Sequence, residues 1–77
     1  MSDTTTPRRT VLLEEIRRTG GQWGRVRAAR FNEAQGFGGN RDTARQDLRA
    51  LVRRGALVQI TTDGRCAYTA ATAGGDR

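Results

Sequence analysis

Three polar side chains suited to reading a nucleic-acid duplex occur within five residues of this sequence. A helix would place Arg45, Gln46 and Arg49 on neighbouring parts of its surface. A guanidinium group can donate two hydrogen bonds to guanine, and a glutamine amide can form a matching pair with adenine. The segment therefore has side chains suited to the base edges exposed in a major groove.

Residues 40–55 contain the signals of a helix that could present these side chains. Asn40 can cap it by accepting a hydrogen bond from the backbone N–H of Asp42 or Thr43. A glycine, Gly55, follows two arginines at the other end and is typical of a helix stop. The apolar residues recur at helical spacing, namely Ala44, Leu48, Leu51 and Val52. We therefore expect a helix over 41–54 that buries this stripe.

The face opposite the apolar stripe is polar and mostly basic. It holds Asp42, Gln46, Arg49 and Arg53, with Arg45 on its flank. Arg41, near the start of the helix, is expected to contact a phosphate. Asp47 would be repelled by DNA, so we expect it to pair with an arginine nearby in the sequence.

A β-hairpin is predicted directly after this helix. Leu57–Thr61 and Arg65–Thr69 flank Asp63-Gly64, a dipeptide typical of a two-residue hairpin turn. The expected register sets Thr62 opposite Arg65, Ile60 opposite Ala67, and Gln59 opposite Tyr68. Either face of the hairpin could lie on the core, one with Val58 and Ile60, the other with Leu57 and Tyr68. Arg65 either contacts a phosphate or the minor groove, or is an unattached surface residue.

A basic helix that ends in glycine and continues into a hairpin resembles the recognition helix and wing of a winged helix. Thr43-Ala44-Arg45-Gln46-Asp47-Leu48, followed by Gly55-Ala56-Leu57-Val58, resembles the T-x-R-[RQ]-D-L … G-x-[LIV] signature of DeoR-type winged helix-turn-helix domains. The segment is also similar, more loosely, to the DNA-reading domain of FtsK-type translocases. The resemblance covers residues 40–69. It implies that Thr43 and Arg45 contact phosphates or bases, with Gln46 in the place of a second arginine.

The first half of the chain supplies two further helices. The first is expected from Pro7 to about Thr19, with Thr6 as its cap. Arg8 and Arg9 near its start either reach a phosphate or stay solvated. Trp23 is expected to anchor the core and to join the edge of the sheet as a short strand. The second helix is predicted over Gly24–Gln35. The residues expected to face the core from it are Val26, Ala28 or Ala29, and Phe31.

The fold class expected is α+β: a winged helix-turn-helix of three helices and a small antiparallel hairpin, with two or three strands in the wing. Residues 7–69 would form this domain. Residues 1–6 are polar and are expected to be a disordered leader, and 70–77 a disordered tail.

Composition limits the kinds of function. The chain has 77 residues and a formal net charge of +6, and all 14 basic residues are arginine. This excess favours a polyanionic partner such as nucleic acid.

There is no histidine, and Cys66 is the single cysteine. We therefore expect no enzymatic activity, metal, cofactor or small-molecule ligand. Without a signal peptide or transmembrane run, we expect a cytoplasmic, nucleoid-associated protein that does not enter membranes.

These features predict sequence-specific binding of double-stranded DNA by a small transcriptional regulator or a phage- or plasmid-type accessory factor. It would act alone, as a weak homodimer or as a cooperative array on DNA. Two alternatives remain open: a winged-helix module that binds an acidic protein, or the DNA-reading domain of a translocase. The residues expected to contact DNA are Arg41, Thr43, Arg45, Gln46, Arg49, Arg53 and Arg65.

Overall fold

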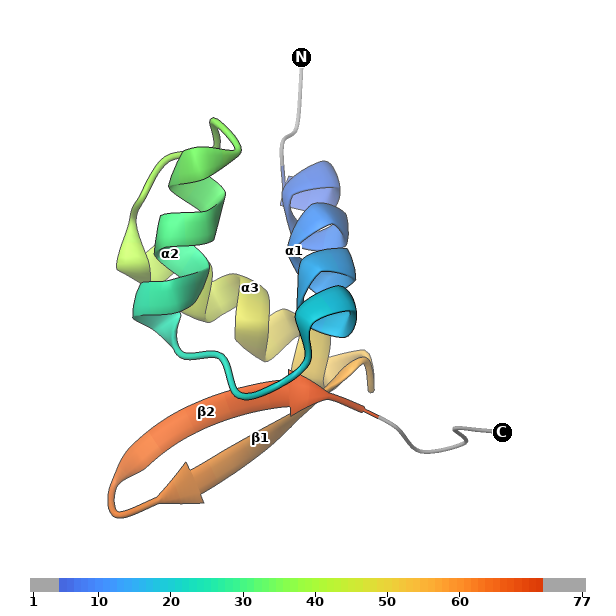
Figure 1. The fold of residues 1–77 in the computed structure, drawn as a ribbon, viewed down its shortest axis with the longest axis vertical. Coiled ribbons are helices and arrows are strands. Elements are labelled where there is room, and N and C mark those ends of the chain that lie inside the picture. Colours follow the sequence, from blue (N-terminus) through green and yellow to red (C-terminus); the bar gives the residue numbers. More distant parts are fainter. Residues whose placement is uncertain (1–4, 72–77) are drawn as a thin grey trace.

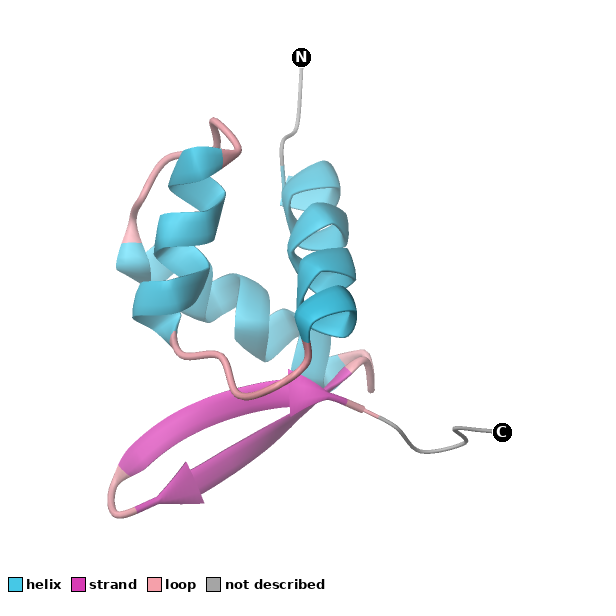
Figure 2. Cartoon of the chain, viewed as in Figure 1, coloured by secondary structure: helices cyan, strands magenta, loops and turns pink. Residues whose placement is uncertain are grey.

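Three helices and one hairpin form the part of the chain that the structure describes. The computed structural model describes residues 5–71. Figures 1 and 2 show α1 and α2 beside each other, α3 crossing behind them, and the hairpin below. This is a small α+β fold, compatible with the predicted winged helix. The elements follow in the order α1 (Thr5–Thr19), α2 (Arg25–Ala34), α3 (Arg41–Arg53), β1 (Leu57–Thr62) and β2 (Arg65–Ala70).

The ends of several elements differ slightly from the prediction. Helix α1 begins at Thr5, so Thr6 lies inside its first turn and does not cap it. Pro7 is accommodated there because the first N–H groups of a helix have no partner within the helix. The sheet continues to Ala70, which pairs with Leu57, so the strand enters the predicted tail. The rest of the predicted leader and tail, 1–4 and 72–77, lies outside the described residues.

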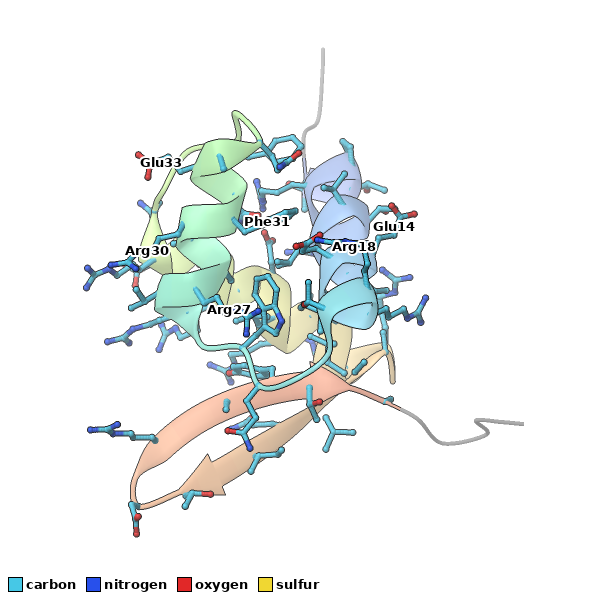
Figure 3. All side chains as sticks on the ribbon, viewed as in Figure 1. Glu14, Arg18, Arg27, Arg30, Phe31 and Glu33 are labelled. Atoms are coloured by element: carbon cyan, nitrogen blue, oxygen red, sulfur yellow. The ribbon has the colours of Figure 1, made fainter. Side chains whose placement is uncertain are left out.

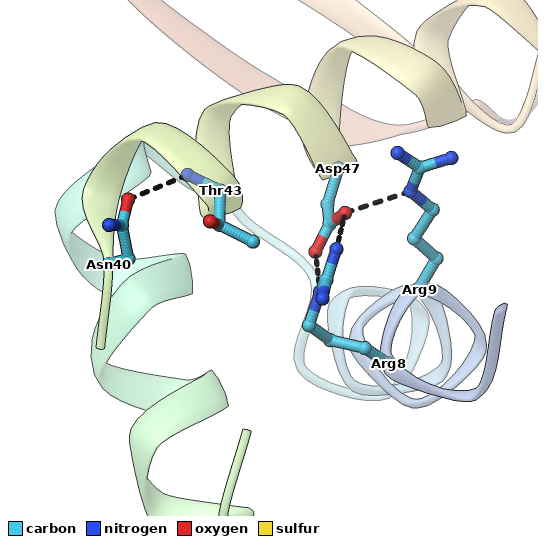
Figure 4. A network of polar contacts seen from close by, with 5 residues as sticks. All are labelled: Arg8, Arg9, Asn40, Thr43 and Asp47. Carbon is cyan, nitrogen blue, oxygen red and sulfur yellow. Dashed lines mark hydrogen bonds and ion pairs between the residues drawn. The ribbon is translucent and has the colours of Figure 1, made fainter. Parts of the chain in front are cut away.

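Helix α3 has the start and the stop that the sequence predicts. The Asn40 side chain accepts a hydrogen bond of 2.9 Å from the Thr43 backbone N–H (Figure 4). At the other end the helix stops at Arg53, one residue before the predicted end, with Arg54 as its cap, and Gly55 has φ +81°. Two bonds of 2.9 Å close the last turn, from the N–H of Gly55 to the Val52 carbonyl and from the N–H of Ala56 to Leu51. This bonding pattern requires the left-handed backbone that glycine adopts easily.

One hydrophobic core joins all the elements. The predicted apolar stripe of α3 faces it, as do Leu12, Leu13 and Ile16 of α1. The fully buried leucines and isoleucine each contribute about 1.5–3 kcal/mol. Trp23 is also buried, as expected. The buried residues that pack together in this core are Leu12, Leu13, Ile16, Trp23, Ala28, Ala29, Ala44, Leu48, Leu51, Leu57 and Tyr68.

Helix α2 departs from the prediction at Val26. This side chain is 37% exposed, whereas Ala28, Ala29 and the polar Asn32 are buried. A helix turns by about 200° over two residues, so a core centred on Ala28 and Ala29 leaves Val26 outside. Phe31 is half-buried and meets Trp23 edge-on, with ring centroids 6.0 Å apart. Figure 3 shows Phe31 on the side of α2 toward α1 and Arg30 on the opposite side.

The hairpin has the predicted register at every pair named above. Asp63 and Gly64 have φ values of +52° and +76°, as a two-residue turn of type I′ requires. Leu57 and Tyr68 are buried, which identifies their side as the core face. Trp23 and Tyr68 exchange two backbone hydrogen bonds of 2.7 Å, so the Trp23 segment joins the outer edge of β2 as predicted.

Between residues 5 and 71, none of the helices is both long enough and apolar enough to span a membrane.

Candidate nucleic-acid interface

A groove of about 880 Å³ lies between α3 and the hairpin, and the start of α2 forms its third wall. Arg45 and Arg49 reach it from α3, and Arg65 from the first position of β2. Arg25, the first residue of α2, completes the basic lining. We refer to these four residues as the groove arginines. The other lining residues are Gly24, Val26, Gln59, Gly64, Cys66 and Tyr68.

No carboxylate among residues 5–71 forms an ion pair with a groove arginine. All four are exposed. Ion pairs among residues 5–71 join Arg8 and Arg9 to Asp47, and Arg18 to Glu15, and none of these pairs includes a groove arginine. Four unpaired guanidinium groups around one concave surface create a positive potential that attracts an anionic ligand.

The structure brings together only part of the predicted contact set. Arg45, Arg49 and Arg65 line the groove, whereas the other four predicted residues do not. Three of these, Arg41, Gln46 and Arg53, are exposed elsewhere on α3. Thr43 is half-buried, and its backbone N–H is occupied by the Asn40 cap. The exposed side of α3 therefore extends the basic surface beyond the groove.

Asp47 explains how α3 is fixed to the body of the protein. Its side chain is fully buried, and it accepts hydrogen bonds from Arg8 Nη2 at 2.7 Å and Arg9 Nε at 2.8 Å (Figure 4). Arg8 Nε binds the second carboxylate oxygen. The prediction of a partner nearby in the sequence is wrong, because Arg8 and Arg9 precede Asp47 by 39 and 38 residues. Arg8 and Arg9 are therefore not simply solvated. Neither predicted alternative for this helix end, phosphate contact or solvation, included their contact with Asp47.

Arg25 is the lining arginine that sequence reasoning missed. It lies in the first turn of α2, where a cation is disfavoured by the helix dipole. That turn contains no acidic residue, and its cap, Gly24, has no side chain to accept an N–H bond. The sequence contained one signal, a basic residue two positions after Trp23, which was expected to join the sheet. Its distance from Arg65 could be known only after the hairpin had been placed.

Arg27 has a different role from Arg25, although it is only two residues away. Its guanidinium lies 4.1 Å from the centroid of the Trp23 ring and donates a 3.1 Å hydrogen bond to the Gln22 carbonyl. Cation–π attraction of this kind contributes roughly 0.5–1 kcal/mol at an exposed site. Arg27 therefore ties the first turn of α2 to the loop that precedes it.

Comparisons of the chain with protein families, curated proteins and solved structures gave no match.

Proposed function

We propose that this chain is a winged helix-turn-helix domain that binds double-stranded DNA through α3 and the hairpin. The observation that supports this most is the convergence of four exposed, unpaired arginines from three elements on one groove. DNA carries regularly spaced negative charges, and release of its counterions drives binding to such a surface. The DeoR-type resemblance of residues 43–58 supports the same function.

Helix α3 would enter the major groove, which is about 12 Å wide and accepts a helix of about 10–12 Å diameter. Arg45, Gln46 and Arg49 would face base edges, because they lie on its exposed side. Arg65 from the hairpin, which would be the wing, and Arg25 from α2 would contact phosphates on either side. Phosphate contacts fix the position of the protein, whereas base contacts select the sequence.

Sequence preference would come mainly from Gln46 and Arg49. Arginine suits guanine and glutamine suits adenine, and each good paired contact discriminates by about 1–3 kcal/mol. Such a domain would serve as a small transcriptional regulator or as an accessory factor. Selection from a random pool of duplexes, followed by sequencing, would reveal any preferred site. Gln46→Ala should then relax the preference at one base step and leave the others unchanged.

The proposal is tested by measuring the affinity for duplex DNA of four variants at one fixed salt concentration. We expect Arg45→Ala, Arg49→Ala and Arg65→Ala each to weaken binding by about tenfold. The matched control is Arg17→Ala, which removes the same charge from an exposed position on α1 outside the groove. If all four variants lose affinity equally, only net charge matters and the proposed orientation is wrong.

An acidic protein is the alternative ligand for the same groove. Val26 places apolar surface inside the basic groove, as an acidic amphipathic peptide would require. If duplex DNA does not bind at moderate salt, while a polyglutamate-containing peptide binds and depends on Arg45 and Arg65, the groove is a protein-interaction site.

A further inference from the structure

Strand β1 leaves one edge of the sheet open. Its only partner within residues 5–71 is β2, whose opposite side is occupied by the Trp23 segment. In Figure 1, β1 is accordingly the strand farther from the loop that precedes α2. The open edge therefore runs along Leu57–Thr62.

The hydrogen-bonding pattern identifies which backbone groups point out of this edge. Trp23 and Tyr68 exchange both N–H···O=C bonds, so the backbone groups of Tyr68 face away from β1. Its pair with Gln59 must then be the non-hydrogen-bonded type, because the two types alternate in an antiparallel ladder. The N–H and C=O groups of Gln59 consequently point outward, as do those of Leu57 and Thr61. They make no backbone hydrogen bond to another described segment.

Strand β1 also lacks the features that usually protect an open edge. Its sequence, Leu-Val-Gln-Ile-Thr-Thr, contains neither a charge nor a proline, and its pairing with β2 runs without a bulge. On its outer face Val58 is 48% exposed, and Ile60 beside it is half-buried. An edge of this kind readily accepts another strand.

We propose that β1 pairs antiparallel with β1 of a second copy of this chain, about a two-fold axis at Gln59. In this register Gln59 lies opposite Gln59 of the second copy, and Leu57 lies opposite Thr61. All the outward-pointing residues are then paired, and each pair exchanges two backbone hydrogen bonds. Any other register leaves at least one of them unpaired.

The outer face of the joined sheet supports this register independently. The same two-fold axis sets Val58 opposite Ile60 of the second copy, and this apolar pair occurs twice. This pairing would cover the Val58 side chain, which is exposed in the single chain. A partner of opposite charge has no reason to choose this strand, because β1 carries no charge to attract it. The second copy is favoured because its edge is identical and a two-fold contact is self-complementary.

The interface would be small, so the association would be weak and concentration-dependent. It uses the backbone of β1 and the outer face of the hairpin. The groove arginines are therefore not needed, and the inference does not rest on DNA binding. The test is accordingly made without nucleic acid.

Sedimentation equilibrium of the full chain from about 10 µM to about 1 mM measures this association. We expect the average mass to rise from the monomer value toward twice that value. Val58→Lys should raise the dissociation constant by about tenfold or more, because it removes an apolar contact and places two like charges near the axis. Thr69→Lys is the matched control, since Thr69 pairs with Val58 on the same face but lies one strand away from the open edge.

Disulfide cross-linking tests the register. With Cys66→Ser present, Gln59→Cys should give a covalent dimer on oxidation, because the two Cα atoms would be about 5.5 Å apart. Thr61→Cys is on the same strand and face, but its two copies would be about 14 Å apart. It should remain monomeric.

Three results would contradict the proposed β1–β1 pairing. A chain that stays monomeric throughout the concentration range overturns the proposal. So does association that Val58→Lys and Thr69→Lys affect equally, because the contact then lies elsewhere. Cross-linking of Thr61→Cys as efficiently as Gln59→Cys would reject the two-fold axis at Gln59. None of these three results depends on whether the groove arginines bind DNA, so failure here leaves the proposed function to its own test.

Discussion

At the scale of single residues, Asp47 is a side chain whose partners depend on tertiary packing and not on local sequence. Its neighbours on the buried side of α3, Ala44, Leu48 and Leu51, were predicted from their spacing. A carboxylate in that position can be buried only if cations reach it, because an unpaired charge in the interior is very costly. Arg8 and Arg9 provide them from α1. No local pattern indicates such a contact, because it depends on how the two helices pack.

Removing this carboxylate should destabilise the fold substantially. We expect Asp47→Asn to lower the free energy of unfolding by about 3 kcal/mol. The value lies at the low end of the range for broken buried pairs because Arg8 and Arg9, with side chains 12% and 30% exposed, can partly recover solvent. Urea denaturation measures the loss.

The matched control breaks a pair at the surface. Glu15→Gln removes the partner of Arg18, whose side chain is 71% exposed, and should leave the denaturation midpoint nearly unchanged. Equal effects of Asp47→Asn and Glu15→Gln would show that the buried contact does not hold α3.

At the scale of elements, local signals predicted α3 and the hairpin well and α2 poorly. Asn40, Gly55 and the Asp63-Gly64 turn act within a few residues of themselves, so the helix ends and the strand register followed from the sequence. Helix α2 has two alanines and a buried asparagine toward the core and only a half-buried phenylalanine beside them. Its orientation is set by packing, and so the exposure of Val26 was not predicted.

The cap of α3 gives a prediction at this scale. Asn40→Ala should destabilise the protein by about 1 kcal/mol, because the Thr43 N–H loses its acceptor. Asn40→Asp keeps a side-chain oxygen at the same position and should retain the stability. Thermal unfolding followed by circular dichroism compares the two. A loss as large for Asn40→Asp as for Asn40→Ala would contradict the capping role.

At the scale of the whole molecule, the distribution of charge matters more than its total. The formal net charge of +6 was known from the sequence, but it does not say where the unpaired arginines lie. Within the described part of the chain, Arg8 and Arg9 pair with Asp47 and Arg18 pairs with Glu15, whereas no carboxylate there pairs with a groove arginine. Of the residues predicted on α3, Arg45 and Arg49 line the groove, and tertiary packing adds Arg25 from α2.

This distribution predicts how DNA binding depends on salt. If Arg25 and Arg65 each neutralise a phosphate, the logarithm of the binding constant should fall with the logarithm of salt concentration at a slope of about −2 or steeper. Arg65→Gln should reduce the slope by about one, whereas Arg17→Gln should leave it unchanged. Fluorescence anisotropy with a labelled duplex provides the curves. A slope near zero in the unmodified protein would remove the electrostatic part of the proposal.

The most direct test of the proposed DNA interface is a nuclear magnetic resonance titration of the labelled chain with a short duplex. We expect the largest amide shifts on the exposed side of α3 from Arg45 to Arg49, and on Arg25 and Arg65. The outer side of α1 around Arg17 should stay unchanged. Shifts confined to α1, or none at moderate salt while the protein remains folded, would contradict the central claim that this groove receives DNA.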